Sequence, residues 1–108
     1  NGRRGMAVDS LVSGGCIVSG ALARRSVLFT GVHLHSFSSV EEAVLLPGVE
    51  VGRHCRLRKV VIDEGCHIPV GMTIGFDALA DARRFYRSEG GVVLVTSAML
   101  AALGERLD

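Results

Sequence analysis

Hydrophobic residues recur along this chain at a spacing of seventeen residues, so that four rows starting at Asp9, Ser26, Ala43 and Val60 fall into register. Three aliphatic columns run through the rows: Leu11, Leu28, Leu45 and Ile62; Ile17, Leu34, Val51 and Ile68; Ala23, Val40, Leu57 and Ile74. A glycine column accompanies them at Gly14, Gly31, Gly48 and Gly65. A fixed period of this length indicates a repeat protein in which each row is one structural unit.

The spacing within a row predicts the shape of the unit. The aliphatic columns lie six, six and five residues apart, and each follows a column of small or modest apolar residues two positions earlier. Two examples of those smaller columns are Gly15, Val32, Val49 and Cys66, and Ala21, Ser38, Cys55 and Met72. Because alternate residues of a strand face the same side, each row predicts three short strands with an inward apolar face. Rows stacked at strand spacing, about 4.8 Å, form a three-sided prism. A helix is excluded, because the apolar period is two and glycine or proline interrupts each row.

The repeat ends near Gly75, and the remaining residues are expected to cap the open end of the stack. The segment "RRFYRSEGGVVLVT" predicts a hairpin with its turn at residues 89–91. Thr96 or Ser97 is expected to N-cap a short helix that runs through Leu103 and ends at Gly104. The predicted organisation is therefore an interdomain segment over residues 1–8, a β-helix over 9–75 and a cap over 76–108. The chain opens on Asn1, which indicates a piece of a longer protein.

Composition narrows the class of protein. With 108 residues the chain fits one domain, and twelve basic against eleven acidic residues leave a net charge of +1. This balance gives no case for a nucleic-acid or membrane partner, and there is no apolar run long enough to span a bilayer. Three cysteines without a CxxC motif indicate reduced thiols and a cytoplasmic protein. Cys55 and Cys66 are predicted to face inward as small hydrophobes, whereas Cys16 is predicted to face outward.

The repeat resembles the hexapeptide-repeat proteins. That resemblance implies an all-β fold, a left-handed parallel β-helix of about four coils of seventeen residues with a C-terminal hairpin and short-helix cap. The left hand is taken from the resemblance, since spacing alone gives no hand.

Histidines in such proteins can serve as zinc ligands or as the base of an acyltransferase. Here His33 and His67 share an outward column but lie two rows apart, with Glu50 between them, and His35 and His54 occupy different columns. A three-histidine site would therefore have to assemble across a subunit interface. The sequence favours histidines solvated on the wall of the prism.

Arginines provide the other candidate chemistry. Arg83, Arg84 and Arg87 crowd the start of the predicted cap, and Arg3 and Arg4 precede the first row. Guanidinium groups bind phosphate and carboxylate through paired hydrogen bonds. These five arginines are therefore candidates for binding an anionic effector. The alternative is a solvated rim in which they pair with nearby carboxylates.

Longer stretches carry a closer resemblance. The segments "DSLVSGGCIVSG", "AVLLPGVEVGRHCRLRKVVID" and above all "DARRFYRSEGGVVLVT" resemble the C-terminal domain of the bacterial glucose-1-phosphate adenylyltransferases, from about residue 5 to residue 103. The resemblance implies a parent enzyme that makes ADP-glucose and pyrophosphate from ATP and glucose 1-phosphate with Mg²⁺. It also implies that the chemistry belongs to an N-terminal nucleotidyltransferase domain, whose glycine-rich loop and metal-binding aspartates are absent here. The chain itself is expected to be inactive.

The same resemblance implies the regulatory role of the domain. In that family the β-helix packs on the catalytic domain, supports a cytoplasmic homotetramer and helps to form an allosteric site between domains. Activators there are glycolytic intermediates and the inhibitor is commonly AMP. This chain has Glu64, Ser97 and Ala101 where enteric members carry basic residues. A carboxylate at Glu64 repels phosphate, so fructose 6-phosphate or pyruvate is a better expectation than fructose 1,6-bisphosphate.

Two other functions stay open at the level of sequence. One is a trimeric hexapeptide-repeat acyltransferase that uses an acyl thioester, although the coils offer neither a plausible inter-subunit histidine nor a protruding loop. The other is a purely structural β-helix of a different sugar-nucleotide transferase. A nucleotidyltransferase domain upstream of Asn1 would exclude the acyltransferase.

Overall fold

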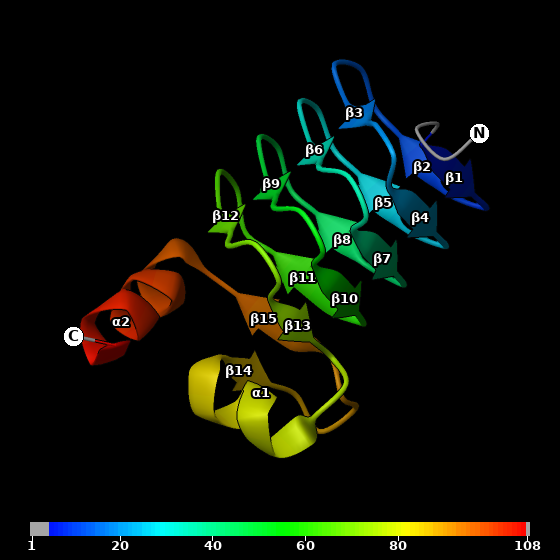
Figure 1. Cartoon of the computed structure of the whole chain (residues 1–108). Coiled ribbons are helices and arrows are strands. Elements are labelled where there is room, and N and C mark those ends of the chain that lie inside the picture. The colour runs from blue at the N-terminus through cyan, green and yellow to red at the C-terminus, as the bar shows by residue number, and fades with distance from the viewer. Residues whose placement is uncertain (1–4, 108) are drawn as a thin grey trace.

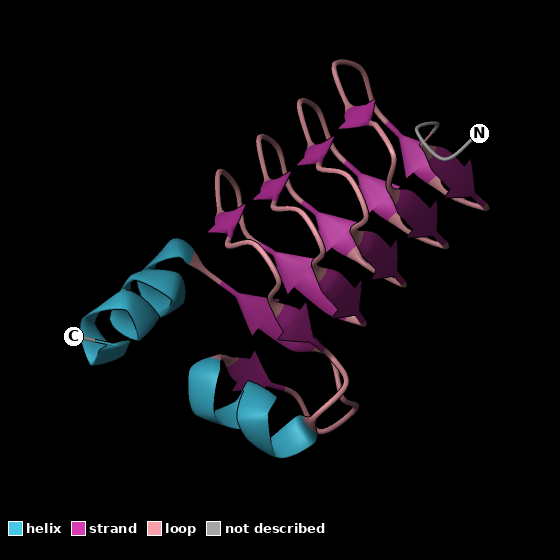
Figure 2. Cartoon of the chain, viewed as in Figure 1, coloured by secondary structure: helices cyan, strands magenta, loops and turns pink. Residues whose placement is uncertain are grey.

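The computed structural model describes residues 5–107 and shows a parallel β-solenoid of about four turns with a helical cap at one end (Figure 1). Each turn contributes one strand to each of three sheets, as the sequence pattern predicts. Figure 2 shows the strands stacked coil on coil, with the helices gathered at the end that carries the C-terminus. Among the described residues, no helix is both long and apolar enough to cross a membrane.

The three sheets run along the stack. The first sheet contains β1 (Met6–Val8), β4 (Leu22–Arg24), β7 (Ser39–Glu41), β10 (Arg56–Arg58) and β13 (Thr73–Ile74), in that order. The second contains β2 (Leu11–Val12), β5 (Val27–Leu28), β8 (Val44–Leu45), β11 (Val60–Ile62), β15 (Val93–Val95) and β14 (Tyr86–Arg87). The third contains β3 (Ile17–Val18), β6 (His33–Leu34), β9 (Glu50–Val51) and β12 (His67–Ile68). All the neighbouring strands pair in parallel except β14, which runs antiparallel to β15.

The core consists of aliphatic residues that stack coil on coil inside the prism. In the second sheet Leu28 pairs with Leu45, Leu45 with Ile62, and Ile62 with Val95, and all four are fully buried. Burial of one such side chain contributes about 1.5–3 kcal/mol. The inward columns predicted for the second, third and fourth coils are confirmed. Val95 adds a rung that the repeat did not predict, because the chain returns to this sheet only after its first cap helix.

The first coil differs from the predicted register by one residue. Ile17 pairs with His33 and Leu11 with Val27, a spacing of sixteen residues, whereas Leu22 pairs with Ser39 at seventeen. The missing residue lies in the third corner of the coil, residues 19–21, which is one residue shorter than the corresponding corner over residues 35–38.

This shift reverses the sides that the residues of β2 and β3 face, because side chains alternate along a strand, whereas Ala23 on β4 is buried as predicted. Val18 and Cys16 pack against the core, whereas Leu11 and Ile17 are 71% and 50% exposed. The prediction that Cys16 faces outward is therefore wrong. Its Sγ lies 3.0 Å from the carbonyl oxygen of Phe29 in the next coil.

The cap begins with a helix that the sequence pattern did not predict, α1 (Ala78–Arg84). Asp77 caps it by accepting a hydrogen bond of 3.2 Å from the backbone N–H of Ala80. The hairpin of β14 and β15 is confirmed, and Gly91 takes the left-handed backbone conformation its turn requires, with φ of 88°.

The second cap helix, α2 (Ser97–Leu107), is longer than predicted. Thr96 Oγ1 accepts a hydrogen bond from the backbone N–H of Met99 at 3.2 Å, which confirms Thr96 among the two expected caps. The helix continues through Gly104, so the predicted end there is wrong. One glycine inside a helix costs only about 1 kcal/mol. The packing of Met99, Leu100 and Leu103 against the core offsets it.

Candidate functional site

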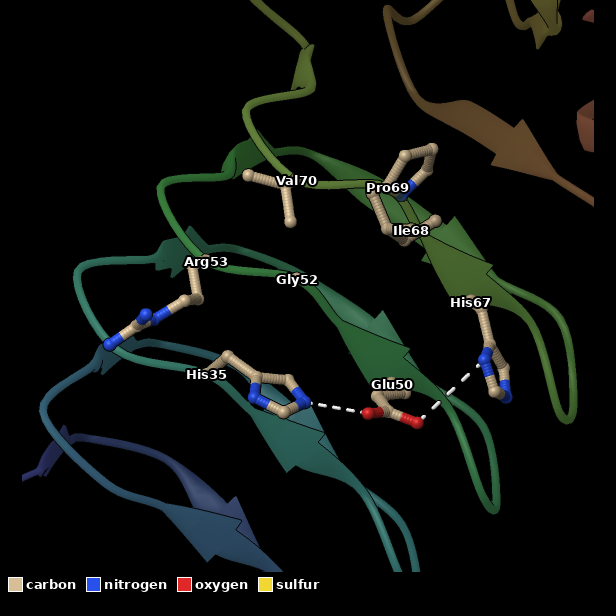
Figure 3. Close-up of a pocket in the computed structure, with 8 residues that line it drawn as sticks. All are labelled: His35, Glu50, Gly52, Arg53, His67, Ile68, Pro69 and Val70. Carbon is tan, nitrogen blue, oxygen red and sulfur yellow. Dashed lines mark hydrogen bonds and ion pairs between the residues drawn. The ribbon is translucent and has the colours of Figure 1, made fainter.

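Four polar side chains gather on the outer face of the third sheet: His33, His35, Glu50 and His67, named here the histidine–glutamate cluster. The parallel register places His33 beside Glu50 and Glu50 beside His67 on successive rungs. His35 follows β6 and lies two residues after His33, so both imidazoles project from the same side of the chain. Figure 3 shows Glu50 between His35 and His67, with an interaction to each.

Hydrogen bonding organises the cluster around Glu50. Its Oε2 lies 2.6 Å from Nε2 of His35, and its Oε1 lies 3.7 Å from Nδ1 of His67. The ring of His33 stacks on that of His35 with centroids 3.9 Å apart and planes inclined by 21°. The hydrogen bond from His35, together with the positive potential of the three imidazoles, lowers the pKa of Glu50 against the opposing effect of desolvation. Glu50 is therefore the fixed anion of the cluster.

A pocket of about 330 Å³ opens beside the cluster, between the third and fourth coils. His35, Glu50 and His67 line one side of it, and Gly52, Arg53, Ile68, Pro69 and Val70 line the rest (Figure 3). Gly52 permits the close approach of these coils, because a Cβ there would lie 2.8 Å from the carbonyl oxygen of Ile68. The pocket therefore offers a carboxylate, imidazole nitrogens and one guanidinium group to a small ligand.

The sequence predicted only part of this cluster. The column of His33, Glu50 and His67 is as expected, but His35 was assigned to a different column. Two histidines separated by one residue on a strand share a face, and that was the available signal. His33, His35 and Glu50 bring one ligand atom each within 4.8 Å of one another inside a single chain. A subunit interface is thus not required to bring donor atoms together.

His67, within the cluster, and His54, outside it, are both exposed, as expected of wall positions. The side chain of His67 is 74% exposed, and His54 is exposed at the third corner. His54 stacks on Phe37 with ring centroids 5.0 Å apart, away from the cluster.

The structure places Arg83 and Arg84 on α1 and Arg87 on β14. Arg84, at the end of α1, donates to the carbonyl oxygen of Thr73 at 2.7 Å and to the buried carboxylate of Asp81 at 3.1 Å. It thus joins the cap to the last strand of the first sheet. Arg83 is exposed on α1 and Arg87 is exposed on β14. Arg3 and Arg4 lie outside the described residues.

Comparison with known proteins places this solenoid in a family. A family model described as GlmU-like, C-terminal hexapeptide matches residues 1–95. The chain belongs to this hexapeptide family. Membership of a hexapeptide family is consistent with the stacked parallel sheets of the structure and with the repeat observed in the sequence.

The relatives of this hexapeptide chain share a name. It is 83% identical over 102 residues to the glucose-1-phosphate adenylyltransferase of Albidiferax ferrireducens. It is 56% identical over 102 residues to that of Paramagnetospirillum magneticum and 59% identical over 103 residues to that of Yersinia pseudotuberculosis serotype IB. The matches cover 94%, 94% and 95% of this chain but only 24% of each relative. The chain therefore spans about a quarter of the length of these relatives.

Proposed function

We propose that this chain is the regulatory and assembly domain of a cytoplasmic glucose-1-phosphate adenylyltransferase, which converts ATP and glucose 1-phosphate to ADP-glucose and pyrophosphate in glycogen biosynthesis. The observation that carries the proposal is the 83% identity to one such enzyme over 94% of the chain. The match covers 24% of that enzyme, so the remaining three-quarters of its length has room for a catalytic nucleotidyltransferase domain.

The Mg²⁺ of the reaction belongs to that other domain. Among the residues that the structure describes, the side chains grouped closely enough to share an ion are His33, His35 and Glu50. Two of these three ligands are nitrogen, whereas Mg²⁺ prefers oxygen in octahedral geometry. This donor set does not fit Mg²⁺, and we assign no catalytic step to the residues that the structure describes.

The regulatory part of the proposal concerns the start of the cap. The domain packs on its own catalytic domain within a homotetramer, and the effector is a small anion such as fructose 6-phosphate, pyruvate or AMP. Arg83 and Arg87 are the leading contacts, because both are exposed beside the end of the solenoid. Arg84 already holds Thr73 and Asp81, so its loss is expected to loosen the cap itself.

The full-length enzyme tests this role through the variants Arg83→Ala, Arg84→Ala and Arg87→Ala. A charged hydrogen bond contributes about 1.5–3 kcal/mol. Removing an effector contact should therefore raise the half-saturating concentration of fructose 6-phosphate, pyruvate or AMP by about tenfold or more. We expect this change for Arg87→Ala or Arg83→Ala, and a lower melting temperature for Arg84→Ala. Unchanged half-saturation for all effectors in all three variants would make the arginines structural. Absence of pyrophosphate release by the wild-type full-length enzyme would overturn the adenylyltransferase assignment instead.

A further inference from the structure

We propose that His33, His35 and Glu50, with His67 as a fourth ligand, form a binding site for a divalent first-row transition metal of the Zn²⁺ class. This proposal goes beyond the adenylyltransferase role and does not depend on it. It rests on three donor side chains that the fold brings together on the outer face of the third sheet.

The distances suit a single ion. The donor atoms of His33, His35 and Glu50 all lie within 4.8 Å of one another. Zinc binds imidazole nitrogen and carboxylate oxygen at about 2.0–2.2 Å in a tetrahedron, which separates two ligand atoms by about 3.4 Å. A pair at that limit would close by about 1.4 Å, whereas Nε2 of His35 and Oε2 of Glu50, which lie 2.6 Å apart, would open by about 0.8 Å. Side-chain rotation can supply this movement, because the three side chains are only partly buried and the strand register stays unchanged.

His67 completes the set from the next coil. Its Nδ1 already lies 3.7 Å from Glu50 Oε1, and its exposed ring is free to turn toward the same point. Three nitrogens and one carboxylate oxygen then surround the ion. Such a donor set suits zinc, cobalt, nickel or copper, and it does not suit calcium or magnesium, which prefer oxygen.

A metal here would join the second, third and fourth coils. His33 lies on β6, Glu50 on β9 and His67 on β12, which are consecutive strands of the third sheet. A ligand that binds the folded state but not the unfolded state raises the melting temperature. At a free Zn²⁺ concentration a hundredfold above the dissociation constant, we expect a rise of about 10 °C or more.

Titration calorimetry with Zn²⁺ alone tests the site on the tag-free 108-residue chain after treatment with a chelator. We expect one Zn²⁺ bound per chain, and an affinity lowered at least about tenfold by His35→Ala and by Glu50→Gln. His54→Ala is the matched control, because this histidine stacks on Phe37 outside the cluster, and its affinity should stay within about twofold of wild type. Substitution with Co²⁺ identifies the ligands: a visible four-coordinate band without thiolate charge transfer excludes the cysteines.

Each result of these experiments either supports the proposed metal site or overturns it. Glu50→Gln preserves the shape of the side chain, so it keeps the test valid where His35→Ala does not fold, as judged by circular dichroism without metal. The proposal is overturned by the absence of a saturable site at one equivalent of Zn²⁺. It is also overturned if His54→Ala weakens binding as much as Glu50→Gln, or if Zn²⁺ leaves the melting temperature of wild type unchanged.

Discussion

At the scale of single residues, stability depends on the inward columns. Leu45 is fully buried between Leu28 and Ile62 in the second sheet. Leu45→Asp would place a carboxylate in the prism without a partner, which costs several kcal/mol. We expect the domain to unfold at a much lower temperature, or not to fold at all, when followed by circular dichroism. An unchanged melting temperature would mean that position 45 does not face the core.

Two buried thiols predict how stability varies with pH. Burial raises the pKa of Cys55 and of Cys66, so the native state holds these protons more tightly than the unfolded chain. Their stabilising contribution is complete below the unfolded pKa of about 8.5 and is lost as the pH rises through the higher native pKa. Urea unfolding between about pH 8 and pH 10 should show a steeper loss of free energy for wild type than for Cys55→Ala/Cys66→Ala.

The control for that experiment is Cys16→Ala, which removes a thiol from the first coil, where the core is only partly covered. This variant should keep the steep alkaline loss of wild type. If the free energy of unfolding falls with pH equally steeply for wild type and for the double variant, the role of the two buried thiols is contradicted.

Residue patterns predicted the candidate site only in part, for a physical reason. The column of His33, Glu50 and His67 follows from the repeat, because parallel coils place equivalent residues side by side. The contact between His35 and Glu50 is diagonal, from one coil to a different column of the next. A comparison of residues within one column of the repeat therefore does not predict the contact between His35 and Glu50. The roles of the cap arginines could not be predicted from the repeat, because the hydrogen bonds from Arg84 to Thr73 and Asp81 depend on the tertiary fold.

At the scale of elements, the strands were predictable and the corners were not. Coils two to four follow the seventeen-residue period, which the aliphatic columns made visible. The short corner at residues 19–21 changes the period to sixteen in the first coil, and glycine and small residues there give no sign of which corner lost a residue. The helix α1 was missed because only seven residues form it, and Asp77 is its one clear sequence signal.

The junction between the last coil and the cap depends on Gly75. Its φ is 98°, and a Cβ there would lie 1.9 Å from the backbone carbonyl oxygen of Arg58. Gly75→Ala should therefore destabilise the domain by about 2 kcal/mol or more, or about 8 °C in melting temperature. Gly14→Ala is the matched control, because a Cβ there meets nothing within 4 Å, and it should change stability by less than about 0.5 kcal/mol. Equal melting temperatures for the two variants would contradict the close approach at Gly75.

At the scale of the whole molecule, the proposed function predicts that this domain is inactive alone. We expect the 108-residue chain, supplied with ATP, glucose 1-phosphate and Mg²⁺, to release no pyrophosphate above the buffer blank. The reason is that the proposed catalytic groups lie in the other three-quarters of the enzyme. Pyrophosphate release by a preparation free of host enzyme would overturn the claim that the catalytic groups lie outside this chain.

The cap covers part of one end of the stack. On the last rung of the first sheet, the carbonyl oxygen of Thr73 is taken by Arg84, and in the second sheet β15 is covered by the antiparallel β14. Within the described residues, β1, β2 and β3 each have a sheet neighbour on one side only. Among the same residues, β12 in the third sheet and β14 in the second also have a neighbour on one side only, so strand edges that another copy could extend remain at both ends of the stack.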